Sequence, residues 1–410
     1  MRILYLSQYF PPEAGATQAR AYEMAKTWVK LGHQVTMLAE IPNHPSGIIP
    51  KYFRGKIYER SDLDGIDVIR VWVKTSPIKN FINRMLFYLT YMINATLAGI
   101  FLAHGKYDLI YASSPPLFVG GAALAMRAIK RIPLVFEVRD LWPESAIALG
   151  ELRNRRVIAM AQKLEEACYH KALQVVVVTH NNYEHLTQRG IEKDKLFYVP
   201  NGANVEMFTF HQTGRVRIRH QLGLEQKFIA IYAGIHGLAQ GLETVFDAAR
   251  LLQSNPDVHF LLIGDGPKKA ELLTLAETYK LPNLTMLPEK PREQIPDYLS
   301  AADVALIPLK KAKVFKGALP SKIFDAWSCE IPVLISIDGE ASQVVEDAQG
   351  GIYIPPEDAE KMAEALIYLK DSPSERKKFA ENGLNYTRQH HSRAALAEQL
   401  ILHLEKCLKH

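Results

Sequence analysis

The sequence predicts an α/β protein built from two doubly wound domains that face a cleft. The chain has 410 residues, which is more than a single hydrophobic core usually serves. Strand patterns alternate with helix patterns through both halves, as is typical of parallel sheets covered by helices. A polar, irregular stretch at residues 209–227 separates the halves, so we expect domains at residues 1–208 and 209–391. A last helix, at about residues 392–410, is a candidate to pack back on the first domain.

Net charge, cysteine content and the first residues limit the classes of protein to which this sequence can belong. A formal net charge of +5 is too small and diffuse to indicate nucleic acid, but it favours an anionic membrane surface or a phosphorylated substrate. Cys168, Cys329 and Cys407 lack metal-ligand spacing and are too few for a disulfide framework, so we expect a cytoplasmic protein. The first residues predict a strand, because their apolar run is too short for a secretory signal peptide.

The first half opens with a strand, a loop, a helix and a second strand at residues 2–39. In such folds ligands bind at the carboxyl ends of parallel strands, so Gly15 in the loop is a candidate for substrate contact. The glycine spacing of a dinucleotide fingerprint is absent, and an ordinary strand-to-helix connection explains the loop equally well.

Asp62-Leu63-Asp64 resembles the triplet by which some sugar-transferring enzymes hold a divalent cation. However, Gly65 follows it directly, and residues 66–73 have a strand pattern. We therefore favour a hairpin turn between two strands over a metal site.

Residues 85–103 contain no charged side chain. As a helix they would be about 28 Å long, but their polar side chains favour a buried or membrane-surface helix over a membrane span. Basic residues lie before the helix and in a preceding loop, namely Lys79 and Arg84, and Lys51, Arg54, Lys56 and Arg60. The pattern predicts binding to anionic membranes, and a helix packed entirely in the core is the alternative.

A strand at residues 134–138 delivers four polar or aromatic side chains at its carboxyl end, namely Arg139, Asp140, Trp142 and Glu144. Charges at this position of a parallel sheet favour a functional role. Arg139 is a candidate anion clamp, and Asp140 or Glu144 is a candidate contact for a hydroxyl-rich substrate.

In the second half, residues 316–340 predict a loop, a short helix and a strand. Gly317 lets a ligand approach the backbone, and Ser321 is expected to cap the helix, whose free amides could hold an anion. Asp325 would then accept hydrogen bonds from neighbouring hydroxyl groups. A phosphate beside a ribose suits this arrangement, and an ordinary loop-helix-strand unit is the alternative.

These residues resemble the B-type glycosyltransferases, and among them the large retaining family often numbered four. The resemblance rests on Val-Pro-Asn-Gly at residues 199–202 with Phe208, Gly-Asp-Gly-Pro at 264–267, Tyr-Leu-Ser-Ala-Ala-Asp at 298–303, and Lys-Ile-Phe-Asp-Ala-Trp at 322–327. Residues 138–145 and 239–242 are most similar to the fucosamine-transferase subgroup of O-antigen and capsule assembly.

The resemblance implies two Rossmann-like domains, the first binding the acceptor and the second the sugar nucleotide. The implied donor contacts are Gly15, Gly234, His236, Gly264, Gly317, Ala318, Leu319, Ser321, Lys322 and Asp325, and the acceptor-side candidates are Trp142 and Glu144. The implied catalytic residues are Arg139, Asp140 and Lys322.

The sequence also departs from the family pattern. The family has two glutamates eight positions apart, where this chain has Gly317 and Asp325, and it places Arg and Lys where this chain has Ile235 and Gln240. Another cation must therefore neutralise the donor diphosphate. Lys322 is the first candidate, Arg139 the second and Lys316 the third.

The leading hypothesis is a retaining glycosyltransferase that moves an acetamido or deoxy sugar from a UDP-sugar to a lipid-linked or saccharide acceptor, without a metal or other cofactor. The expected partners are the sugar nucleotide, the acceptor and the inner face of the cytoplasmic membrane, and not nucleic acid. An epimerase or hydrolase acting on UDP-sugars is one alternative. A catalytically silent nucleotide-binding subunit of a polysaccharide assembly complex is the other.

Overall fold

The computed structural model describes residues 1–13, 15–43, 46–78, 80–148, 150 and 152–409. It divides the chain into two compact units: unit 1 contains Met1–Pro200 and Ala394–His410, and unit 2 contains Asn201–Arg393. The division falls at Pro200 rather than at the expected residue 208, because Phe208 packs into the hydrophobic core of unit 2. The C-terminal residues lie with unit 1, where Leu400 and Leu404 join the core around β1 (Arg2–Leu6).

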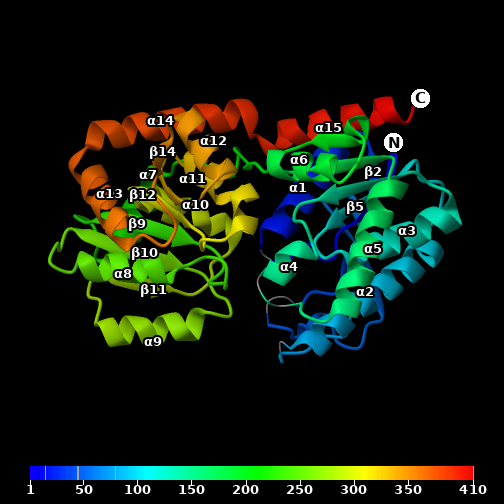
Figure 1. Ribbon diagram of the computed structural model, residues 1–410, viewed down its shortest axis with the longest axis horizontal. Coiled ribbons are helices and arrows are strands. Elements are labelled where there is room, and N and C mark those ends of the chain that lie inside the picture. The colour runs from blue at the N-terminus through cyan, green and yellow to red at the C-terminus, as the bar shows by residue number, and fades with distance from the viewer. Residues whose placement is uncertain (14, 44–45, 79, 149, 151, 410) are drawn as a thin grey trace. The chain divides into compact units, whose positions relative to one another are not determined.

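Unit 1 is built on an eight-stranded sheet (Figure 1). Its strand order is β3-β4-β2-β1-β5-β6-β7-β8, and the strands are parallel except that β3 runs antiparallel to β4. The remaining strand bounds are β2 Gln34–Glu40, β3 Tyr58–Leu63, β4 Ile66–Val71, β5 Leu109–Ser114, β6 Leu134–Val138, β7 Gln174–Val177 and β8 Leu196–Tyr198.

Asp64 and Gly65 form the turn between β3 and β4, and the carboxylate of Asp62 in β3 accepts a hydrogen bond from the amide of Gly65 at 3.1 Å. The prediction of a hairpin turn is confirmed. Among the residues that the structure describes, no three side chains of the kinds that hold metal ions form a group.

Helices cover both faces of the unit 1 sheet. Their bounds are α1 Ala16–Lys30, α2 Phe81–Phe101, α3 Phe118–Lys130, α4 Glu144–Ala148, α5 Arg155–Lys171, α6 His180–Gln188 and α15 Arg393–Cys407. Leu4 and Leu6 of β1 face one core and Ile3 and Tyr5 the other, because successive side chains of a strand point to opposite faces. A sheet buried on both faces is typical of parallel α/β folds.

The uncharged stretch at residues 85–103 forms most of α2, as predicted. Tyr91, Ala95 and Ala98 bury one side of this helix in the core. No helix in the described part of the chain is both long and apolar enough to cross a bilayer.

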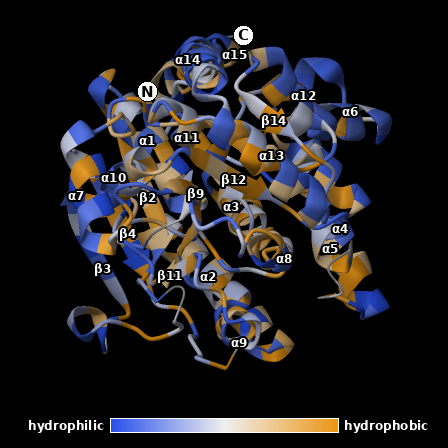
Figure 2. Ribbon diagram, turned by 90° about the vertical axis from the view of Figure 1, so that its left-hand side faces the viewer, coloured by the Kyte–Doolittle hydropathy of each residue, from blue (hydrophilic) through white to orange (hydrophobic). Residues whose placement is uncertain are grey.

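Unit 2 has a six-stranded, fully parallel sheet in the order β11-β10-β9-β12-β13-β14. The strands are β9 Phe228–Ala233, β10 Val258–Ile263, β11 Leu284–Leu287, β12 Val304–Pro308, β13 Val333–Ser336 and β14 Gly351–Tyr353. The helices are α7 Gln212–Leu222, α8 Glu243–Leu251, α9 Lys269–Tyr279, α10 Ile295–Ala301, α11 Lys322–Ser328, α12 Glu340–Ala348, α13 Ala359–Asp371 and α14 Pro373–His390. Figure 2 shows β12 coloured as hydrophobic and α14 as largely hydrophilic, as expected for a buried strand and a covering helix.

The expectation of an irregular stretch at residues 209–227 was wrong, because most of it forms α7. This helix has little apolar pattern beyond Ile218, which is buried in the core, and ion pairs also hold it in place. Arg215 and Arg219 both reach the carboxylate of Asp303, at 2.8 and 2.6 Å. A single carboxylate distant in sequence therefore stabilises a helix that its own composition does not predict.

The strand order of unit 2 is that of a doubly wound sheet, in which successive strands are added on one side of β9 up to β11 and on its other side from β12 onward. In such sheets ligands bind at this point, outside the carboxyl ends of the strands. The loops that follow β9 and β12 are therefore where a ligand of unit 2 should bind.

Candidate functional site

The loop that follows β9 begins with Gly234, whose backbone φ of +149° favours glycine. A Cβ atom at this position would overlap the ammonium group of Lys322, the first residue of α11. The loop of β9 and the start of α11 therefore meet at the switch point of the sheet, and the absence of a side chain at Gly234 leaves room for Lys322.

Lys322 is half-buried, and its Nζ donates a hydrogen bond to the hydroxyl of Tyr232 at 2.7 Å. The same Nζ lies 4.0 Å from the centroid of the Tyr232 ring. Burial lowers the pKa of Lys322 to about 7, although the carboxylate of Asp325 opposes this shift. An anionic ligand beside Lys322 would stabilise its charged form further.

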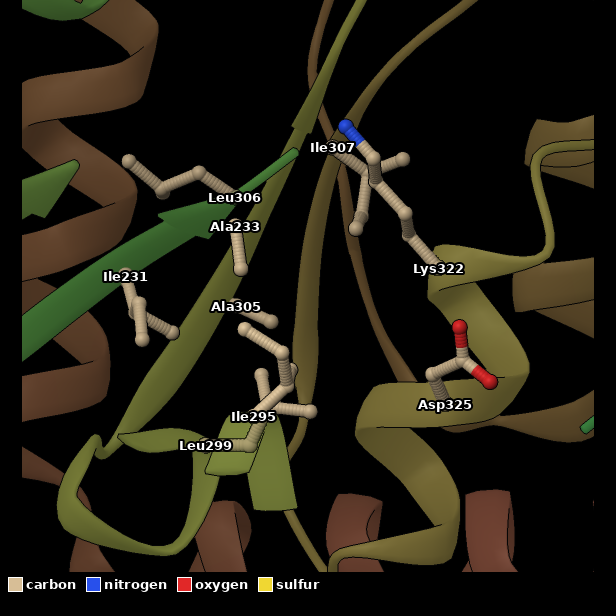
Figure 3. Close-up of a pocket in the computed structure, with 9 residues that line it drawn as sticks. All are labelled: Ile231, Ala233, Ile295, Leu299, Ala305, Leu306, Ile307, Lys322 and Asp325. Carbon is tan, nitrogen blue, oxygen red and sulfur yellow. The ribbon is translucent and has the colours of Figure 1, made fainter. Parts of the chain in front are cut away.

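Lys322 and Asp325 project from α11 toward a pocket whose other walls are apolar (Figure 3). Its apolar lining comes from β9, β12 and α10, and consists of Ile231, Ala233, Ile295, Leu299, Ala305, Leu306 and Ile307. A mostly apolar pocket with a few polar groups at one side is typical of small-molecule sites.

His236 lies in the same loop as Gly234 and is fully buried. Neither ring nitrogen has a hydrogen-bond partner within the described residues. Burial, with the charges of Lys269 and Lys322, lowers the pKa of His236 to about 4, so its ring is neutral at physiological pH. A neutral imidazole with unused nitrogens remains able to donate to or accept from a ligand or a water molecule.

The other residues predicted to contact a donor have different roles. A Cβ atom on Gly264 would overlap the carbonyl of Gly234, so this glycine allows two loops to pack together. Leu319 is buried in the core of unit 2, with Gly317 buried nearby and Ala318 partly buried. The prediction that Ser321 caps α11 was wrong, because its backbone is helical and its side chain makes no capping hydrogen bond.

In unit 1 the residues predicted from the end of β6 have partners of their own. Arg139 lies near the buried carboxylate of Glu137 and helps to lower its pKa. Asp140 accepts a hydrogen bond from Ser145 at 2.8 Å. The carboxylate of Glu144 lies 3.2 Å from His185 of α6, so this side chain links two helices.

Two further predicted residues of unit 1 lie on loops at the carboxyl edge of its sheet. The Trp142 ring packs edge-on against Phe118, with ring centroids 6.1 Å apart. Gly15 precedes α1 with a φ of +150°, and a Cβ atom there would overlap the side chain of Gln18.

Comparison with known proteins decides the family. Residues 215–386 match the family of glycosyl transferases group 1, and residues 15–202 match the glycosyl transferase 4-like domain. The chain belongs to the group 1 glycosyltransferases. Its two parallel-sheet units are the two domains of the B-type glycosyltransferase fold.

Individual relatives of this glycosyltransferase are distant in sequence. It is 23% identical to a putative colanic acid biosynthesis glycosyl transferase, WcaI of Escherichia coli (strain K12), over 94% of this chain and 97% of the relative. Among solved structures, sucrose-phosphate synthase from Thermosynechococcus elongatus superposes with a TM-score of 0.78 at 20% identity, covering 99% and 98% of the two chains. Anabaena Alr3699/HepE, solved in complex with UDP-glucose, superposes with a TM-score of 0.74 at 18% identity over 99% and 100%.

Sequence analysis of this glycosyltransferase missed two buried polar groups. Tyr232, whose hydroxyl accepts a hydrogen bond from Lys322, was not identified because it lies within the apolar run of β9. Glu137 is fully buried in β6, where it accepts hydrogen bonds from Arg20 at 2.9 Å and Tyr111 at 2.8 Å. An acidic residue within a continuous apolar strand was the signal for Glu137, because a buried charge requires partners.

Proposed function

We propose that this glycosyltransferase is a retaining enzyme that transfers an acetamido or deoxy sugar from a UDP-sugar to a lipid-linked or saccharide acceptor in bacterial cell-surface polysaccharide synthesis. The observation that carries the proposal is the placement of Lys322 and Asp325 on one helix, facing one pocket at the switch point of unit 2. Support for the donor comes from Alr3699/HepE, whose structure holds UDP-glucose. Support for the pathway comes from WcaI, which is named for colanic acid biosynthesis.

The chemistry follows from the two polar groups of the pocket. The ammonium of Lys322 would stabilise the negative charge that develops on the leaving diphosphate, which is the main catalytic effect in such reactions. Asp325 would accept hydrogen bonds from the ribose hydroxyls. His236, Gly234, Gly264 and Gly317 would border the donor, and Arg139 and Lys316 are further candidate cations.

In a retaining transfer the departing phosphate can accept the proton of the acceptor hydroxyl on the same face of the sugar. The reaction then needs no second carboxylate at the spacing used by glycosidases. Because Lys322 would supply the positive charge at the diphosphate, we propose that no metal is required. Asp140, Trp142 and Glu144 of unit 1 are the proposed contacts of the acceptor.

An apolar face of α2 supports peripheral membrane binding of unit 1. Ile82, Leu86, Ile93, Leu97 and Phe101 lie on one side of this helix, since their spacing follows the helical repeat, and all are exposed, Ile82 by 68% and Phe101 by 64%. The helix has 21 residues, so the face is about 31 Å long. Apolar faces accompanied by basic residues bind anionic bilayers.

Basic residues of the same unit accompany this face. Lys51 and Arg54 are exposed shortly before β3, and the half-buried Lys56 lies 3.7 Å from the ring centroid of the exposed Tyr52. Arg84 is in α2 itself, whereas Lys79 lies outside the described residues. We propose that the enzyme lies on the inner face of the cytoplasmic membrane through this surface.

Sedimentation with vesicles tests the membrane proposal. The protein should sediment with phosphatidylcholine vesicles that contain phosphatidylglycerol, and high salt should release part of it. Replacing Arg84 and Lys79 with Ser should weaken binding at low salt, and Ile82→Ser should weaken it at both salt concentrations. Leu402→Ser is the control, because Leu402 is exposed on α15. Equal loss of binding in the control, or no binding by the wild-type protein, would contradict the proposal.

The enzymatic proposal is tested by incubating the protein with a panel of UDP-sugars, with and without lipid-linked acceptors, in EDTA. We expect release of UDP together with a glycosylated acceptor, in which the transferred sugar keeps the anomeric configuration that it had in the donor. Rapid conversion of a UDP-sugar without acceptor would indicate an epimerase or hydrolase instead. UDP binding without turnover across the panel would indicate a silent subunit.

A further inference from the structure

Four consecutive backbone carbonyls lie where the chain passes from unit 1 to unit 2, at residues 199–202. Each accepts a hydrogen bond from a buried side chain. Arg20 donates to the carbonyls of Val199 and Pro200 at 3.0 and 2.8 Å, His391 Nδ1 to that of Asn201 at 2.7 Å, and Arg393 to that of Gly202. Residues 199 and 200 are therefore held within unit 1, and residues 201 and 202 within unit 2.

On the unit 2 side, a two-residue bridge strengthens this restraint. Ala203 pairs with Ser392, and the amide of Ala203 donates to the carbonyl of His391 at 2.9 Å. Residues 201–203 and 391–393 consequently form one small structural element. This element lies in the described part of the chain directly beside both crossing points, at Pro200 and Arg393.

The same element contacts the segment that carries the candidate donor site. The side-chain amide of Asn201 donates to the carbonyl of Leu319 at 3.0 Å, in the loop three residues before Lys322. The ring of His391 stacks on Phe324, with centroids 3.9 Å apart and planes inclined by 13°. Leu319, before Lys322, and Phe324, after it, are thus in contact with Asn201 and His391 respectively.

We infer that Asn201 and His391 are positioning residues for donor binding, which act through the Leu319 carbonyl and the Phe324 ring to hold Lys322 and Asp325 toward the pocket. The inference rests on the proposed function, because it takes a nucleoside diphosphate as the ligand. The contacts of Asn201 with Leu319 and of His391 with Phe324 restrain both partners of each pair. A ligand bound by Lys322 and Asp325 therefore also restrains residues 201–203, by which the chain enters unit 2.

Side-chain replacements can separate the two contacts of His391. His391→Phe keeps a ring for stacking on Phe324 but loses the hydrogen bond to the Asn201 carbonyl. His391→Gln keeps a donor but loses the stacking. Asn201→Leu removes the bond to Leu319 without adding a charge. His390→Phe is the matched control, since its ring lies on the neighbouring residue and contacts Tyr386 rather than Phe324.

The experiment measures the affinity of each full-length variant for UDP by calorimetry, together with hydrogen exchange. Because each variant loses one hydrogen bond or stack, we expect the Kd for UDP to rise about 5- to 20-fold in the three variants and to stay unchanged in His390→Phe. The KM for the UDP-sugar should rise more than kcat falls. In the wild-type protein, UDP should slow amide exchange at residues 201–203 as well as at 319–325.

Two outcomes overturn the inference alone. In the first, the variants lose thermal stability but bind UDP as tightly as the wild-type protein. Asn201 and His391 would then have a structural role only. The other is wild-type protein in which UDP protects residues 319–325 but not 201–203, a measurement that does not depend on variant folding. Failure of the wild-type protein to bind UDP at all would instead overturn the proposed function, and the inference with it.

Discussion

Replacement of Lys322 by Met should weaken UDP binding by an amount that depends on pH. The ammonium is half-buried, its hydrogen bond goes to a neutral tyrosine, and its pKa is lowered to about 7 by burial. A hydrogen bond from an ammonium to a phosphate contributes about 1.5 to 3 kcal/mol, so the variant should bind UDP about 10- to 150-fold more weakly at pH 6, where Lys322 is charged.

At pH 8 most of the free protein carries neutral Lys322, and the ligand can bind the charged form only after a proton is taken up. For a pKa of about 7, this protonation costs about 1.4 kcal/mol at pH 8, or tenfold in affinity. The ratio of the variant and wild-type Kd values should therefore be about tenfold smaller at pH 8 than at pH 6. Because both proteins bind the same ligand, the ionisation of UDP itself cancels in this ratio.

Calorimetry in buffers of different ionisation enthalpy gives the affinity and the proton uptake together. The wild-type protein should take up about 0.9 proton on binding UDP at pH 8, Lys322→Met should lose this uptake, and Lys322→Arg should bind without it. Lys377→Met is the control, since Lys377 is 79% exposed in the same unit. A ratio of Kd values near one at both pH values would refute the assignment of Lys322 to the diphosphate.

Three further predictions concern unit 2. Asp325→Ala should weaken UDP binding roughly ten- to a hundredfold in calorimetry without unfolding the protein, and Asp325→Glu should be tolerated better than Asp325→Asn; an unchanged Kd in Asp325→Ala would remove this residue from the site. Gly234→Ala should reduce the rise in Tm that UDP produces, because the new Cβ forces the Lys322 ammonium to shift; a normal rise would show that Lys322 need not occupy this place. Asp303→Asn should lower the free energy of unfolding in urea by about 3 to 5 kcal/mol, because it leaves Arg215 and Arg219 without their carboxylate, whereas Asp371→Asn at an exposed site should change it by less than about 0.5 kcal/mol.

Sequence patterns predicted the alternation of strands and helices well, because buried parallel strands are continuous apolar runs and glycines mark the loops between them. The patterns failed for α7, in which Arg215 and Arg219 form ion pairs with the distant Asp303. They also placed the domain boundary at residue 208, since nothing local shows that Arg20 holds the carbonyls of Val199 and Pro200.

The candidate site was predictable in part. Residue types and spacing identified Lys322 and Asp325 as neighbours on a short helix, and the structure shows them facing one pocket. The roles of Tyr232 and His391 depend on which strands and helices become neighbours, so no local pattern indicated them. For Ser321 the residue type suggested a cap, but the helical backbone at that position prevents it.

In the proposed function, Lys322 and Asp325 hold a nucleoside diphosphate. Titration of the wild-type protein with uridine, UMP and UDP in the presence of EDTA tests it most directly. The second phosphate of UDP should add at least about tenfold in affinity over UMP, because it reaches the ammonium of Lys322, and EDTA should leave the affinity for UDP unchanged. Equal affinities for UMP and UDP, or binding of UDP that requires an added divalent cation, would contradict the claim.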